Sequence, residues 1–229
     1  MLMDTAQIIQ TIAVYALPVL LAITLHEAAH GYAARQFGDN TAWLAGRISL
    51  NPLRHIDPLG TIVMPIAIYF LTQGAFLFGY AKPVPVDFNA LNHPKRDMIW
   101  VALAGPGANL FQAILWGIAY VLLKGLGIDE PFLVKTCQAG VFVNVIMMVF
   151  NLLPLPPMDG GRVLVGLLPW RAAMAVSRIE PYGFFILLAL LLMGLVSEFW
   201  MQPLMALSFT LLDALLAPLR WLLLSGPGE

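Results

Sequence analysis

The chain has 229 residues, of which 60% are hydrophobic and only 11% carry a charge, and its mean hydropathy is +0.82. This apolar fraction lies well above that of an ordinary soluble domain, so the composition predicts a membrane protein. The formal net charge is −1 and no long run of like charges occurs, which argues against nucleic acid as a partner. The single cysteine, Cys137, excludes an internal disulfide and is expected to pack in an apolar segment.

The chain contains six apolar segments, most of them long enough to cross a bilayer as helices. They cover residues 8–37, 61–78, 98–123, 132–153, 181–196 and 199–224. No internal repeat or low-complexity linker separates them, and no basic stretch precedes the first one as it would in a signal peptide. We therefore expect an all-α polytopic membrane protein in which residues 1–229 form a single membrane-embedded domain.

The placement of lysine and arginine predicts the orientation of these segments, because basic loops tend to stay in the cytoplasm. No basic side chain precedes the first segment, whereas three arginines lie at its end or after it and three more follow the segment 132–153. These arginines are Arg35, Arg47, Arg54, Arg162, Arg171 and Arg178. We expect both segments to run from outside to inside, so one of the two segments between them cannot cross the membrane fully.

The segment that does not cross is expected to be residues 61–78, because Pro65 and Gly74 interrupt it. The alternating prolines of the following Tyr80–Asp87 stretch favour extended backbone over helix. Irregular backbone is tolerable at membrane depth only where protein covers it or where it lines a water-filled cavity. We therefore predict five to six apolar segments, with residues 61–87 forming a re-entrant, partly extended segment.

The first apolar segment carries the sequence His26-Glu27-Ala28-Ala29-His30. Histidines four residues apart lie on one face of a helix, about one turn apart, so both imidazoles can reach one metal ion. Glu27 lies between them, where a carboxylate can deprotonate a metal-bound water, and this H-E-x-x-H arrangement is typical of zinc metalloproteases. Ionisable groups are costly at membrane depth, so we interpret the motif as functional and expect residues 61–87 to cover part of it.

A catalytic zinc ion usually takes three protein ligands and leaves a fourth position for water. The candidates for the third ligand are His55, Asp57, Asp87, His93 and Asp159. Asp159 follows an apolar segment through a proline-broken stretch, and the two glycines after it permit close backbone approach. An aspartate before a glycine is also typical of a turn or a helix cap. We expect Asp159 to be the ligand, because the predicted topology places it on the same side as the end of the first helix.

Several separate motifs occur in order along residues 20–165. They are HEAAH at 26–30, NPLRHIDPLG at 51–60, AGPGAN at 104–109, and Asn151-x-x-Pro154 leading to Asp159-Gly160. Together they resemble the motifs of the site-2 protease family, whose members are intramembrane zinc metalloproteases. The resemblance implies that His26, His30 and Asp159 bind one zinc ion and that Glu27 is the catalytic base. Met158 stands where the family has leucine, which is a conservative apolar change.

The resemblance also implies a biological setting, namely regulated intramembrane proteolysis of the transmembrane segment of another protein. No insert resembling a PDZ domain and no nucleotide-sensing tail is seen, so the chain resembles a minimal bacterial-type member. Its catalytic core would cover about residues 8–165, followed by C-terminal helices at about 181–224. We expect a multi-pass protein of the bacterial inner (plasma) membrane, with its active site toward the cytoplasm and the lipid bilayer and a membrane substrate as partners. The sequence does not predict an oligomeric state.

A substrate helix must unwind locally before its peptide carbonyl can be attacked, so something must hold the unwound strand. We expect the extended segment with Lys82, Val84 and Val86 to pair with it as an added strand. Asn151 and Asn109 are candidate donors to the substrate backbone, although asparagines in membrane helices also form ordinary interhelical hydrogen bonds.

Two other classes of function use the same residues. The chain could be a zinc-containing membrane scaffold or transporter without proteolytic activity, or a membrane hydrolase that acts on lipid amides. Glu27 argues against a purely structural zinc site, because such a site does not need a base. The order of the Asn-Pro and Asp-Gly motifs favours peptide bonds over lipid amides through the family resemblance.

Overall fold

The computed structural model describes residues 5–55, 57–64 and 82–224. Within these ranges all the regular elements are helices, which confirms the prediction of an all-α membrane protein. Most of the predicted re-entrant segment, residues 65–81, lies outside the described residues. The extended stretch that follows it is described from Lys82 onward and has no regular secondary structure up to Asp87.

Four helices are long and apolar enough to cross a membrane, and all four agree with predicted segments to within a few residues. They are α1 (Thr5–Gln36), α4 (Pro94–Gly125), α5 (Pro131–Asn151) and α9 (Gln202–Leu224), the last extended at its start by the π-helical turn η4 (Ser197–Met201). The helices α7 (Trp170–Ser177) and α8 (Glu180–Leu192) meet at 66° and could form a fifth, broken span. The described part of the chain therefore offers four spans, or five.

The two central helices of the bundle begin at signals that the sequence carries. Pro94 and Pro131 occupy the first turns of α4 and α5, where a missing N–H is not needed. The Glu130 side chain caps α5 by accepting a hydrogen bond from the Leu133 N–H at 2.8 Å. Within α4, Pro106 does not end the helix, as is common in membrane helices where neighbouring groups satisfy the freed backbone.

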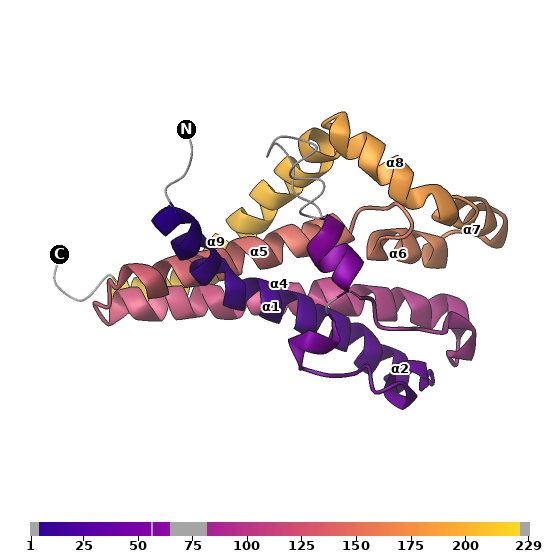
Figure 1. The fold of residues 1–229 in the computed structure, drawn as a ribbon, viewed down its shortest axis with the longest axis horizontal. Helices are drawn as coiled ribbons and strands as arrows, with labels where there is room; N and C mark the ends of the chain where they lie inside the picture. Colours follow the sequence, from indigo (N-terminus) through magenta and orange to yellow (C-terminus); the bar gives the residue numbers. More distant parts are fainter. Residues whose placement is uncertain (1–4, 56, 65–81, 225–229) are drawn as a thin grey trace.

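The helices α1, α4 and α5 lie side by side, and each packs against the other two (Figure 1). Helix α9 packs against α4 and α5, while the short helix α6 (Asp159–Leu167) packs against α4. In Figure 1, α6 and α7 lie at the end of the bundle opposite the connection between α4 and α5. This arrangement brings the start of α6 close to the downstream half of α1, which carries the H-E-x-x-H motif.

Shorter elements connect α1 to α4. They are α2 (Thr41–Leu44), the 3-10 turn η1 (Pro52–Arg54), the π-helical turn η2 (Pro58–Val63) and the 3-10 turn η3 (Phe88–Ala90). Asn51, Asp57 and Asp87 each cap the turn that follows by accepting a backbone N–H. The Asn-Pro and Asp-Pro pairs of the NPLRHIDPLG motif thus form consecutive capped turns.

Candidate active site

Three potential metal ligands meet between α1 and α6. The Nε2 atoms of His26 and His30 are 3.1 Å apart, and each lies 3.3 Å from the Oδ2 atom of Asp159. His26 and His30 lie one turn apart on α1, while Asp159 is the first residue of α6. All three side chains are largely buried. The structure therefore brings together the three residues that the sequence predicted as ligands.

The other ring nitrogen of each histidine fixes which tautomer is present. His30 Nδ1 lies 2.7 Å from the Val101 carbonyl, which can only accept, so Nδ1 must carry the proton. His26 Nδ1 lies 2.6 Å from the Asn109 side-chain oxygen. The Asn109 amide nitrogen donates to the Ala22 carbonyl and to Asn144, which orients the oxygen toward His26. With Nδ1 engaged in this way, Nε2 is the ring nitrogen left to donate an electron pair to a metal ion, and both Nε2 atoms lie near Asp159.

The geometry of these three donors fits a tetrahedral metal ion. Bonds of about 2.0–2.1 Å at tetrahedral angles place ligand atoms about 3.3–3.4 Å apart, close to the 3.1–3.3 Å seen here. The buried Oδ2 atom of Asp159 has no hydrogen-bond partner, so its charge needs compensation. Two imidazoles and one carboxylate are a ligand set that zinc favours, with a fourth position left for water.

Gly105 on α4 keeps the space between the imidazoles open. A Cβ atom at this position would lie 2.3 Å from His30 Nε2 and 2.6 Å from His26 Cε1, so any side chain would push the rings away. Gly107, two residues further on, has no atom within 4 Å of its would-be Cβ. Of the two glycines in the AGPGAN motif, only Gly105 is required by the metal site.

Two further glycines bring Asp159 to its place. A Cβ atom at Gly160 would lie 2.1 Å from the Leu152 carbonyl oxygen, and one at Gly161 would lie 2.3 Å from the Pro156 nitrogen. The start of α6 therefore packs directly against the backbone of the loop after α5. This close approach agrees with the role predicted for the glycines that follow the aspartate.

Glu27 is held by the backbone of the extended segment. Its Oε2 atom accepts a hydrogen bond of 2.7 Å from the Val84 N–H. Glu27 and the three potential ligands line a cavity of about 210 Å³, together with Val84 and Asn151 among others. One carboxylate oxygen is thus fixed by the protein, which orients the group toward the cavity.

The extended segment 82–87 is attached to the protein at both of its ends. At the start of the segment, the Lys82 N–H donates to the His55 carbonyl. At its end, the Asp87 N–H donates to the buried carboxylate of Asp39. Arg47 also donates to the Lys82 carbonyl oxygen at 3.0 Å. These contacts place the segment over the cavity, with Glu27 bonded near its middle.

The residues predicted to bind substrate fall into two groups. Val84, Val86 and Asn151 line the cavity of the potential ligands. Lys82 is exposed outside it, and Asn109 is fully buried behind His26, where its amide is bonded to other protein groups.

The remaining third-ligand candidates lie elsewhere among the described residues. His55 is buried with its Nε2 atom on the Ser49 carbonyl, His93 is exposed beside Asp97, and Asp57 and Asp87 cap turns.

Arg162 is a cavity residue that sequence reasoning missed. It lies one turn after Asp159 on α6, with its guanidinium 4.5 Å from the centre of the Phe88 ring and 3.4 Å from the Glu180 carboxylate. Its spacing of three residues from Asp159 places it on the same helical face, which was the available signal. The cavity therefore has at its edge an arginine that is paired with Glu180.

Membrane-spanning helices and a His-His-Asp site with a glutamate beside it define a membrane zinc metalloprotease. Residues 130–194 match the model of peptidase family M50. The chain is 36% identical over 177 residues to "Putative zinc metalloprotease YwhC" of Bacillus subtilis. The aligned region covers 75% of this chain and 77% of that protein. The chain belongs to family M50, the site-2 protease family.

More distant relatives agree with this assignment. The chain is 28% identical over 209 residues to "Putative zinc metalloprotease Rip2" of Mycolicibacterium smegmatis, covering 87% of this chain and 75% of that protein. It is 30% identical over 177 residues to the protein of the same name from Mycobacterium tuberculosis strain H37Rv, and the aligned region covers 76% of this chain and 64% of that protein. No solved structure matches the chain.

Replacing Gly105 with alanine should abolish zinc binding, because the new methyl group would occupy the space between the two imidazoles. Gly107→Ala is the matched control, since it adds the same group to the same helix where nothing contacts it. Metal analysis of both purified variants measures the difference. Equal zinc content in the two variants would contradict the assigned role of Gly105.

Replacing Asn109 with alanine should weaken zinc affinity by about 10- to 100-fold, because His26 loses the group that orients its ring. Gln112→Ala is the matched control, because Gln112 is a buried amide on the same helix whose side-chain atoms have no hydrogen-bond partner among the described residues, so its effect should be much smaller. Competition with a chelating dye measures both affinities. An equal loss in the two variants would show that general packing, and not ring orientation, is responsible.

Proposed function

We propose that this protein hydrolyses a peptide bond within or near the transmembrane segment of another membrane protein, in regulated intramembrane proteolysis. His26, His30 and Asp159 hold the zinc ion in this proposal, and Glu27 is the catalytic base. The observation that carries it is the set of 3.1–3.3 Å distances between the three ligand atoms, with a glutamate fixed beside them. Helices able to cross a bilayer carry this site, which supports a substrate in the same bilayer.

A zinc ion held by His26, His30 and Asp159 would supply Lewis acidity, which would lower the pKa of a bound water and polarise the substrate carbonyl. Glu27 then takes the proton that the attacking water releases and returns it to the leaving amine. One of its oxygens is held by the Val84 N–H, so the other is available for this transfer. No covalent link between enzyme and substrate is needed.

In this proposal an unwound substrate enters the cavity beside Glu27. Val84 and Val86 line the cavity, which supports pairing of the substrate with the segment 82–87. Pro83 and Pro85 have no N–H, so at these positions the segment offers a substrate strand acceptors but no donors. Asn151 can supply a donor, because only one of its two amide hydrogens is needed for its bond to the Met147 carbonyl.

Asn109 acts in this proposal as a positioning residue for His26 and does not touch the substrate, in keeping with its burial. The active site faces the cytoplasm of a bacterial cell. This orientation is supported by the positions of the proposed ligands near the ends of α1 and α5 that lead into arginine-rich loops, because such loops tend to stay in the cytoplasm.

Glu27→Gln should retain zinc but lose proteolysis by roughly 100-fold or more, since a neutral amide cannot accept the proton. Asp159→Ala should lose both zinc and activity, because only two protein ligands remain. The assay uses purified enzyme with a panel of single-span membrane proteins, together with metal analysis. Full zinc with no cleavage of any substrate by the wild-type enzyme would instead support a scaffold or a lipid-amide hydrolase.

Val84→Pro should lower the cleavage rate by about 10- to 100-fold at unchanged zinc content, because it removes the N–H that orients Glu27. Val84→Ala is the control, since it trims the side chain and keeps the N–H. Rates are compared at saturating substrate, so that weaker substrate binding does not account for the change. The same loss in both variants would assign the effect to the valine side chain.

A further inference from the structure

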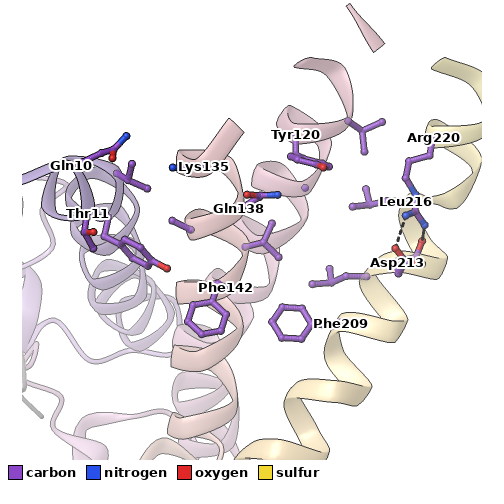
Figure 2. A pocket seen from close by; sticks show the side chains of 17 residues that line it. Gln10, Thr11, Tyr120, Lys135, Gln138, Phe142, Phe209, Asp213, Leu216 and Arg220 are labelled. Atoms are coloured by element: carbon purple, nitrogen blue, oxygen red, sulfur yellow. Dashed lines mark hydrogen bonds and ion pairs between the residues drawn. The ribbon is translucent and has the colours of Figure 1, made fainter. Parts of the chain in front are cut away.

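A second and larger cavity, of about 720 Å³, lies away from the metal site and shares no lining residue with it. It is bounded by α1, α4, α5 and α9 (Figure 2). Val14 lines it from α1, twelve residues before His26, which corresponds to about 18 Å along the helix. The cavity therefore lies toward the opposite membrane face from the potential metal ligands.

The wall of this cavity has two layers of different character. Its floor is apolar and buried, with Val121 and Leu212 among the residues that form it. Its rim is polar and exposed, with Gln10, Lys135 and Gln138 contributed by the N-terminal parts of α1 and α5. An apolar floor beneath a polar rim suits an amphiphile whose head lies at the membrane surface.

Charged side chains of α9 also line the cavity, although α9 is a membrane-spanning candidate. Arg220 reaches back two turns, placing Nη1 2.6 Å from the Asp213 carboxylate and donating from Nη2 to the Asp213 carbonyl. Figure 2 shows this pair on one side of the cavity and Gln10 of α1 on the other. Ionisable residues within membrane helices are costly and mark functional sites by default.

The rim has an excess of positive charge. Arg220 is balanced by Asp213, whereas Lys135 has no hydrogen-bond or ion-pair partner among the residues that the structure describes. One unpaired ammonium group beside neutral amide donors therefore faces an open, partly apolar space. Its natural partner is a group with a single negative charge and several acceptor oxygens.

We propose that this cavity binds an anionic phospholipid of the surrounding bilayer. The phosphodiester oxygens would lie at Lys135, and an acyl chain would lie on the apolar floor between α1 and α9. A free phosphate ion would match the charge but leave the floor uncovered. A transmembrane helix of apolar residues would cover the floor but would offer the Lys135 ammonium group no anionic partner.

The proposal is tested by titrating the purified full-length protein, in nonionic detergent, with phosphatidylglycerol, phosphatidylcholine and soluble glycerol phosphate. Native mass spectrometry and the shift in Tm measure binding. We expect phosphatidylglycerol to bind most tightly, and Lys135→Glu to weaken its binding by about tenfold or more. Lys124→Glu is the matched control, because Lys124 lies near the same end of the bundle but is paired with Asp129 and does not line the cavity.

A second rim variant, Gln138→Glu, should also weaken phosphatidylglycerol binding, which guards against a folding defect particular to Lys135→Glu. Equal binding of phosphatidylcholine, or an equal loss in Lys124→Glu, would overturn the proposal, because the rim charge would then not select the ligand. Glycerol phosphate binding as tightly as the lipid would assign the site to a soluble anion. A single-span peptide that displaces phosphatidylglycerol would assign it to a helix.

Discussion

The arrangement of this protein depends on three electron-pair donors held 3.1–3.3 Å apart in a largely buried space. Without a cation between them, the lone pairs of His26, His30 and Asp159 would repel one another, and the buried carboxylate would be uncompensated. Helix α1 supplies two of these donors and α6 supplies the third. The metal site is therefore also a connection between two elements that are far apart in the sequence.

Helix α4 makes this connection possible in two ways. It passes the imidazoles at Gly105, where the absence of a side chain leaves room for them, and it supplies the Val101 carbonyl that orients His30. One turn further on, Asn109 orients His26 and is itself held by Asn144 of α5. Since Asn144 donates to the Gly140 carbonyl, a continuous chain of hydrogen bonds runs from the ligand into α5. The orientation of His26 thus depends on three helices at once.

The sequence predicted the long helices and singled out the three side chains that the structure brings together, because both depend on short-range patterns: apolar length, the four-residue histidine spacing, and an aspartate followed by glycines. It could not predict the role of Gly105 or the contact of Asn109, since the partner of Asn109 lies 83 residues away and only the packing of α1 against α4 brings them together. The hydrogen bond between Val84 and Glu27 could not be predicted either, because these residues are 57 positions apart and meet only in the folded chain. Whether residues 61–87 re-enter the membrane stays a prediction, because residues 65–81 lie outside the described part of the chain.

The separation of the proposed ligands along the chain has a consequence for biosynthesis. His30 and Asp159 are 129 residues apart, and at roughly 5–20 residues per second a ribosome needs about 6–26 s to pass from one to the other. During that interval α1 has only a two-histidine half-site beside Glu27. On the proposed assignment, the nascent chain would lack its third ligand during insertion, and its active centre would form only after α4 and α5 have been made and α6 has folded back.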